Sequence, residues 1–187
     1  MKIGCVVMAA GEARRFGGDK LAAQVGGKSL LLRALEAVPA ERCTAVAVVA
    51  RRPDFLALAA SFGFLPVENN RPDLGLSRTV RLGLEALGDC RGAMFLAADQ
   101  PLLRRASVER ALDTFEEHPD RIAALACGGR RGNPCVFPAS LFPELLALEG
   151  DTGGSAVIRR HADLLLLVDT PAEELADVDT PDQLPEI

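Results

Sequence analysis

The sequence contains no long apolar stretch, and no run approaches the roughly 18 residues that a membrane-spanning helix needs. Its amino terminus lacks the basic region, apolar region and small-residue cleavage site of a secretory signal. None of the five cysteines is paired in the C-x-x-C spacing of redox and zinc motifs, and two lie in apolar runs. We therefore expect a cytoplasmic protein with no membrane partner, whose cysteines are reduced and structural.

The chain lacks an excess of positive charge, and histidine is scarce. The formal net charge of -5 argues against a nucleic-acid partner, because such proteins gather Lys and Arg on one face. The two histidines, His118 and His161, fall at expected helix ends, and no serine stands in a G-x-S-x-G setting, so no catalytic triad is predicted. No repeat and no linker tract divides the sequence, which indicates a single domain over residues 1–187.

Short apolar runs alternate with stretches of helical periodicity. Strands that alternate with helices predict right-handed βαβ crossovers and a mainly parallel sheet covered on both faces. The expected fold is therefore α/β, a three-layer α/β/α sandwich. The expected strands are Ile3–Met8, Ala45–Ala50, Ala93–Ala98, Ile122–Cys127 and Leu164–Val168.

Capping residues and prolines mark the expected helix boundaries. Ser29 is expected to cap a helix that ends before Pro39. Pro53 suits the first turn of a second helix, and Ser77 is expected to cap a third. A fourth helix is expected over residues 107–118.

A glycine- and cation-rich loop follows the first apolar run. Its small residues Ala9, Ala10 and Gly11 let backbone N–H groups approach an anion closely. Arg15 and Lys20 would supply the counter-charge. Because open α/β sheets bind ligands at the carboxyl ends of their strands, this loop indicates a polyphosphate site. The alternative is an ordinary surface loop with solvated cations.

Two acidic motifs are candidates for a metal site. Asp99 follows the most apolar run in the middle of the chain, and a carboxylate at the end of a central strand suits Mg²⁺ that also binds phosphates. Asp177 and Asp179 alternate along an extended segment, so they share a face, and either can meet Asp99 across a bound ion. The alternatives are a turn role for Asp99 and a solvent-exposed acidic tail.

Other glycine-rich segments are shaped for ligands rather than for packing. Gly75 stands just before Ser77, where a helix amino terminus would hold a phosphate or a nucleotide group, or form only a capped turn. The loop at residues 128–134 adds two arginines, which fits an acidic or phosphorylated acceptor, and residues 150–154 form another glycine cluster. Residues 22–29 resemble a P-loop, but no strand fits before them, which argues against an ATPase or GTPase.

Taken in order, these motifs resemble the MobA-like NTP transferase family, the molybdopterin nucleotidyltransferases that make the dinucleotide form of the molybdenum cofactor. The resemblance spans nearly the whole chain and implies a Rossmann-like sandwich similar to that of nucleotide-diphospho-sugar transferases. The matching elements are Ala9-Ala10-Gly11 with Arg15, Gly17 and Lys20; Gly75-Leu76-Ser77; Ala98-Asp99-Gln100-Pro101-Leu102; Gly132-Asn133-Pro134; Gly150-Asp151-x-Gly153-Gly154; and Asp177-Val178-Asp179-Thr180-Pro181.

The resemblance implies catalytic roles for three of these residues. Arg15 and the backbone that begins at Ala9 would hold the triphosphate, and Lys20 would neutralise charge at the α-phosphate. Asp99 would hold Mg²⁺, with Asp179 rather than Asp177 as the second ligand.

The resemblance also implies which segments contact the rest of the substrates. Gly75 and Ser77 would contact the base and sugar of the nucleotide. Asn133 and Asp151 belong to the segments that would shape the pterin side. One departure lies in the phosphate loop, where Ala13 replaces the usual Ser and its missing hydroxyl removes a phosphate contact, and Arg14 is expected to be solvated.

The Ala-Ala-Gly start is more similar to the cytidylyl branch of the family than to the guanylyl branch. The implied reaction transfers CMP from CTP to molybdopterin, uses Mg²⁺ and releases pyrophosphate, and a molybdenum hydroxylase is a candidate recipient of the product. The alternatives are GTP as nucleotide, another phosphorylated acceptor, or a non-catalytic chaperone that only binds molybdopterin.

Overall fold

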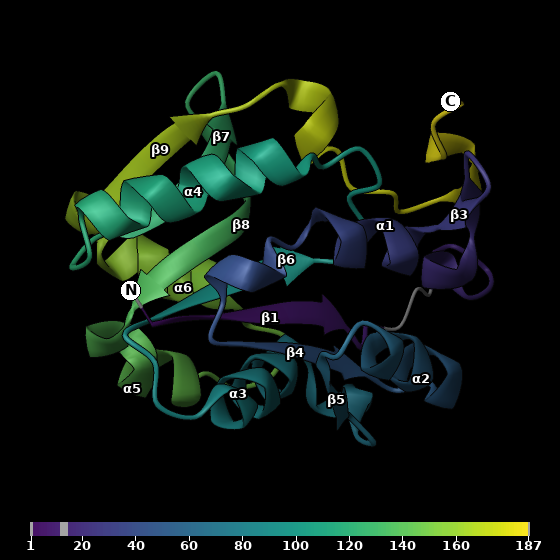
Figure 1. Cartoon of the computed structure of the whole chain (residues 1–187), viewed down its shortest axis with the longest axis horizontal. Helices are drawn as coiled ribbons and strands as arrows, with labels where there is room; N and C mark the ends of the chain where they lie inside the picture. The colour runs from purple at the N-terminus through teal and green to yellow at the C-terminus, as the bar shows by residue number, and fades with distance from the viewer. Residues whose placement is uncertain (1, 12–14, 187) are drawn as a thin grey trace.

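The computed structural model describes residues 2–11 and 15–186, and it is an α/β/α sandwich built on one large sheet (Figure 1). The strands of this sheet are β1 (Ile3–Ala9), β4 (Ala45–Ala50), β5 (Leu65–Glu68), β6 (Gly92–Ala97), β7 (Ile122–Cys127), β8 (Arg130–Pro138) and β9 (Leu165–Asp169). The helices are α1 (Leu30–Ala37), α2 (Pro53–Ser61), α3 (Leu76–Leu87), α4 (Arg105–Glu117), α5 (Phe142–Leu146) and α6 (Gly154–Arg160). A hairpin of β2 (Gln24–Val25) and β3 (Lys28–Ser29) stands apart from the sheet.

The sheet has the strand order β5-β4-β1-β6-β8-β7-β9. All neighbouring pairs are parallel except those that involve β8, which runs antiparallel to both β6 and β7. The predicted mainly parallel sheet and the Rossmann-like class are confirmed, and all five predicted strands are present within one residue at each end. Because β8 is reversed, its first residues lie at the edge where the parallel strands end.

Two apolar clusters cover the two faces of the sheet. Alternate residues of β1 divide between them, since Val7 packs on one face and Val6 on the other. The first cluster includes residues of α1, α2 and α4, and the second includes residues of α3, α5 and α6. In Figure 1, α4 lies on one side of the strands and α3 and α5 lie on the other.

Most of the predicted helix boundaries are correct. Ser29 caps α1, where its hydroxyl accepts a 3.2 Å hydrogen bond from the Leu32 amide, and Pro53 is the first residue of α2. The prediction that Ser77 caps α3 is wrong, because the N-cap is Gly75 and Ser77 lies inside the first turn. The fourth helix begins two residues before the predicted range and has His118 as its C-cap.

The prediction of a glycine-rich loop at residues 128–134 is wrong. Only Gly128 and Gly129 form the turn, both with positive φ, and Arg130 begins β8. A tight two-glycine turn lets β8 fold directly back onto β7, so the rest of the segment becomes a strand.

All five cysteines are free thiols, as expected. Burial raises the pKa of Cys5 well above its ordinary value, which keeps this thiol neutral inside the core. In the described part of the chain, no helix is both long enough and apolar enough to cross a membrane.

The close approach of α3 to the sheet depends on Gly83. A Cβ at this position would lie 2.3 Å from Val6 Cγ1 and 3.2 Å from Val49 Cγ2. Because the clash is with the rigid centre of the sheet, we expect Gly83→Ala to lower the free energy of unfolding by roughly 1–3 kcal/mol, despite the better helix propensity of alanine. Urea denaturation measures the change. Glu85→Ala, on the exposed face of the same helix, is the matched control, and equal stabilities of the two variants would contradict this packing account.

Candidate active site

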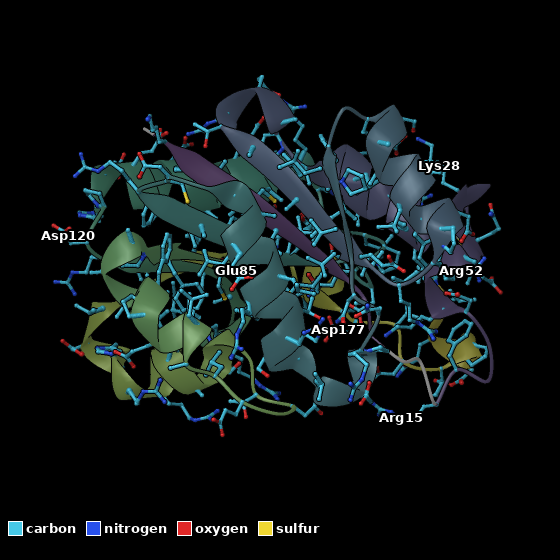
Figure 2. The ribbon with its side chains drawn as sticks, turned by 90° about the horizontal axis from the view of Figure 1, so that it is seen from below. Arg15, Lys28, Arg52, Glu85, Asp120 and Asp177 are labelled. Carbon is cyan, nitrogen blue, oxygen red and sulfur yellow. The ribbon has the colours of Figure 1, made fainter. Side chains whose placement is uncertain are left out.

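The predicted site residues gather at the carboxyl edge of the parallel strands. The phosphate-loop residues Ala9, Ala10 and Gly11 follow β1, and Asp99 follows β6. The carboxyl-terminal segment with Asp177 crosses this edge, since the Val178 amide donates a 3.0 Å hydrogen bond to the Asp99 carbonyl. Figure 2 shows Arg15 and Arg52 toward one end of the molecule, Asp177 nearer its middle and Asp120 at the opposite end.

Lys20 joins the two acidic motifs. Its Nζ lies 2.7 Å from Asp99 Oδ2 and 3.7 Å from Asp179 Oδ1, and its side chain is only 14% exposed. Arg15 contacts the same acid, with Nη2 3.1 Å from Asp179 Oδ2. The two cations of the phosphate loop and the two predicted metal ligands therefore form one charged cluster, which we call the Lys20 cluster.

Asp177 adds a third carboxylate beside the Lys20 cluster. Its pKa is raised by burial first, and then by the negative charges of Asp99 and Asp179, against a hydrogen bond from Gln100 and the charge of Lys20. Val178, between the two acids, is buried in the core. The predicted common face of Asp177 and Asp179 therefore brings both acids to Asp99, and the geometry leaves both as candidates for the second metal ligand.

The carboxylates present fit a hard cation that is shared with a ligand. Among residues 2–11 and 15–186, no group of three or more metal-ligating side chains is arranged to hold an ion alone. Mg²⁺ is characteristically held by one or two protein carboxylates together with substrate phosphates. Asp99 and one of its two acidic neighbours provide this number of carboxylates. Burial and, after it, the negative charges of Asp99 and Asp179 raise the pKa of Asp177, and a bound cation would offset these charges.

Two buried polar contacts hold the acidic segment in place. Glu174 is 2% exposed, and its Oε2 accepts a 3.0 Å hydrogen bond from the Arg104 amide at the start of α4. Gln100 Nε2 donates to the Leu175 carbonyl at 3.2 Å. These contacts fix the path of the chain before Asp177, and neither was apparent in the sequence, because they join residues about 70 positions apart.

Arg52 anchors the end of the phosphate loop. Its Nη1 lies 2.5 Å from Asp19 Oδ2, and its guanidinium stacks 4.8 Å above the centre of the Phe55 ring. Hydrogen bonds to Asp54 and Asp19 raise the pKa of Arg52. Since Asp19 precedes Lys20, the start of α2 positions the loop that carries the central ammonium group.

A cavity of about 600 Å³ opens over this edge. Its walls include Ala10, Gly11, Gly75, Asp99 and Asp177, so it brings together the predicted phosphate, base and metal segments. We call it the nucleotide cavity. Its volume is in the range of ordinary small-ligand sites.

Ser77 is 5% exposed and is not among the residues that line the nucleotide cavity. Gly75 and Thr79, on either side of it, do line the cavity. Thr79 is a wall residue that the sequence did not indicate. The Ser77 amide donates instead to the Gly150 carbonyl at 3.1 Å. A direct ligand contact by Ser77 stays a prediction, and in this structure the residue joins two loops.

Gly75 permits this close loop contact. Its φ is +86°, and a Cβ would lie 2.3 Å from the Gly150 backbone, so only glycine fits without strain. Asn69, which is fully buried, holds the other end of the loop through its side chain. Asn69 Nδ2 donates a hydrogen bond to Thr79 Oγ1, and Asn69 Oδ1 accepts one from the Arg71 backbone amide. The loop over the nucleotide cavity is thus tied at both ends.

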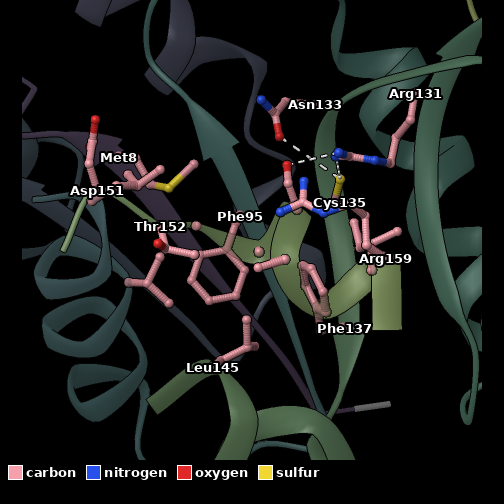
Figure 3. Close-up of a pocket in the computed structure, with 17 residues that line it drawn as sticks. Met8, Phe95, Arg131, Asn133, Cys135, Phe137, Leu145, Asp151, Thr152 and Arg159 are labelled. Atoms are coloured by element: carbon pink, nitrogen blue, oxygen red, sulfur yellow. Dashed lines mark hydrogen bonds between the residues drawn. The ribbon is translucent and has the colours of Figure 1, made fainter. Parts of the chain in front are cut away.

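Two further cavities adjoin the nucleotide cavity. One, of about 340 Å³, lies between β6, β8 and α6, and we call it the apolar cavity (Figure 3). The other, of about 510 Å³, includes Gln100, Leu175 and Asp177 in its walls. Asn133 lines all three cavities and Asp151 lines the nucleotide and apolar cavities, so these two predicted residues lie where the cavities meet.

Two of the residues named from the sequence, Ala13 and Arg14, are outside the described residues. The P-loop-like segment forms the antiparallel β2–β3 hairpin. Lys28, in this hairpin, forms an ion pair with Glu36 at 2.8 Å.

Comparison with known proteins identifies relatives along most of the chain. The purine catabolism protein PucB of Bacillus subtilis is 27% identical over 197 residues, which cover 95% of this chain and 92% of PucB. The bifunctional enzyme IspD/IspF of Rhodospirillum rubrum is 33% identical over 133 residues, 67% of this chain. The chain spans only 34% of the length of that enzyme.

Solved structures share the fold. A nucleotidyl transferase from Methanothermobacter, Mth528, has a TM-score of 0.81 at 21% identity, over 97% of this chain and 93% of that one. Rv0371c of Mycobacterium tuberculosis in complex with manganese has a TM-score of 0.75 at 23% identity, over 97% and 95% of the two chains. The family model described as the MobA-like NTP transferase domain matches residues 5–164. The chain therefore belongs to the MobA-like NTP transferase family of nucleotidyltransferases.

Proposed function

We propose that this protein transfers CMP from CTP to the phosphate of molybdopterin and releases pyrophosphate, with Mg²⁺ as the metal. The observation that carries the proposal is the Lys20 cluster, which lies beside the nucleotide cavity and next to Asp177. Family membership supports nucleotidyl transfer. The choice of CTP and molybdopterin is supported by the motifs of the cytidylyl branch in the sequence.

In the proposed reaction, an oxygen of the acceptor phosphate attacks the α-phosphorus of CTP. A new P–O bond forms on one side while the bond to the β-phosphate bridging oxygen breaks on the other, and pyrophosphate carries away the electron pair. The attacking phosphate is already anionic, so no strong general base is needed. Positioning and neutralisation of charge supply most of the acceleration.

Three side chains of the cluster have separate roles in this proposal. Lys20 leaves Asp99 and moves to the α-phosphate, where its ammonium group offsets the charge that develops in the transition state. Arg15, which is 73% exposed, binds the departing phosphates. Asp99 and Asp179 or Asp177 would hold the Mg²⁺, which supplies Lewis-acid stabilisation of the phosphates when it is bound.

The acceptor approaches from the side of Asn133 and Asp151. These residues line both the nucleotide cavity and the apolar cavity, so a molecule in the apolar cavity can present one end to the nucleotide. Transfer to another phosphorylated acceptor uses the same cluster and is separated from the molybdopterin reaction by assay.

Replacement of the central carboxylate tests the catalytic role. We expect Asp99→Asn to lower the rate of pyrophosphate release by roughly 10²–10⁴-fold with CTP, Mg²⁺ and molybdopterin, because one preorganised charged group is lost. Asp89→Asn is the control, since Asp89 is 96% exposed and lies 3.8 Å from Lys2. A rate of pyrophosphate release by Asp99→Asn close to that of the control would contradict the catalytic role of Asp99. If the wild type releases no pyrophosphate with any nucleotide and acceptor, the result favours the non-catalytic chaperone.

Thermal stability tests the choice of nucleotide. CTP at about 100 times its dissociation constant should raise the free energy of unfolding by about 2.7 kcal/mol, since it binds only the folded protein. The corresponding increase in melting temperature should be smaller with GTP at the same concentration. A larger shift with GTP would replace the cytidylyl proposal by a guanylyl one.

A further inference from the structure

Arg131 lies between the apolar cavity and the 510 Å³ cavity. It extends from β8, is half-buried, and lines both the apolar cavity and the 510 Å³ cavity. Its Nη2 donates a 2.8 Å hydrogen bond to Ser155 Oγ, and its Nη1 lies 3.7 Å from Cys135 Sγ. Two side chains therefore hold the guanidinium in a fixed orientation (Figure 3).

No carboxylate of the described residues forms an ion pair with Arg131, although Asp151 and Asp177 line the same cavities. The side-chain partners of Arg131 among these residues are the Ser155 hydroxyl and the Cys135 sulfur, and neither is a carboxylate. Burial raises the pKa of Cys135, so this thiol stays neutral and donates to the Gly132 carbonyl at 3.3 Å. By contrast, Arg52, Arg71 and Arg105 each pair with a carboxylate. A positioned guanidinium without a counter-ion is suited to bind an incoming anion.

The apolar cavity next to Arg131 is shaped for a ring. Phe95 and Phe137 stand edge to face with their ring centres 5.8 Å apart, and Leu145 completes the wall (Figure 3). Gly154 allows this arrangement, since a Cβ there would lie 2.7 Å from the Phe137 ring. The cavity thus combines an apolar wall with polar lining residues that include Arg131, Asp151 and Arg159, a mixture that is usual in small-molecule sites.

We propose that Arg131 is a specificity-determining residue, whose guanidinium binds the phosphate group of the acceptor where the apolar cavity adjoins the 510 Å³ cavity. This inference rests on the proposed function for the meaning of "acceptor". It deepens that function by assigning recognition of the acceptor phosphate to one residue. Arg131 then determines specificity, because an acceptor without a phosphate leaves its guanidinium unpaired.

Binding of a fluorescent pterin tests the assignment without turnover. The chain has no Trp and no Tyr, so the emission of neopterin monophosphate is measured against little protein background. We expect this probe to bind the wild type and Arg131→Met to bind it roughly 10- to 100-fold more weakly, the loss of a charged hydrogen-bonded contact. Arg131→Lys should lie between them, because an ammonium group keeps the charge but loses the planar fork.

Three controls make the result specific. Arg91→Met removes an exposed cation that lines none of the three cavities and should change binding less than about 2-fold. Neopterin without phosphate should bind weakly and equally to the wild type and Arg131→Met. Each variant should retain the CTP-induced thermal shift of the wild type, which shows that it is folded and that the nucleotide cavity is intact.

Specific outcomes overturn the proposal. These are equal binding of neopterin monophosphate by the wild type and Arg131→Met, equal losses for the Arg131 and Arg91 variants, or no binding to a wild type that responds to CTP. In those cases the acceptor assignment fails and the proposed nucleotidyl transfer stands. No response to any nucleoside triphosphate would instead remove the proposed function itself.

Discussion

The candidate active site depends on the Lys20 cluster, in which the Lys20 ammonium group lies between the carboxylates of Asp99 and Asp179. The carboxylates of Asp99, Asp177 and Asp179 lie at one sheet edge, and burial, followed by the negative charges of Asp99 and Asp179, raises the pKa of Asp177. Lys20 balances part of this negative charge in the free protein. In the proposed reaction a nucleotide and its cation would take over this balance, and Lys20 would exchange its carboxylate partner for a phosphate.

The reversed strand β8 places a second functional region beside this cluster. A parallel strand in the same position would begin at the opposite edge of the sheet. Because β8 is antiparallel to β6 and β7, its first residues, Arg131 and Asn133, lie at the edge where β6 leads into Asp99. The hairpin turn at Gly128 and Gly129 makes this reversal possible. One irregularity in strand direction thus brings the nucleotide cavity and the proposed acceptor side together.

Local patterns predicted the parallel core because buried parallel strands are continuous apolar runs. The same patterns missed β5, which is an edge strand that contains Pro66 and has mostly exposed side chains. They also missed β8, because its Gly and its Asn-Pro pair are typical of a turn. Strand ends placed Asp99 and the loop of Lys20 at the same edge of the sheet, and in the structure Lys20 Nζ lies 2.7 Å from Asp99 Oδ2. The two arginines of residues 128–134 indicated an acidic or phosphorylated acceptor, but not the strand and the cavities in which Arg131 lies. The roles of Arg52 and Glu174 were not accessible in this way, because each depends on a contact between distant segments.

A crystal structure with Mg²⁺ and a non-hydrolysable CTP analogue tests the central claim most directly. The account predicts the analogue in the nucleotide cavity, with its phosphates over residues 9–20 and Lys20 Nζ on a phosphate oxygen instead of Asp99. Cytosine and ribose should lie against Gly75, which lines the same cavity. An analogue bound in the apolar cavity, or phosphates remote from Asp99 with the Lys20–Asp99 pair still formed, would contradict it.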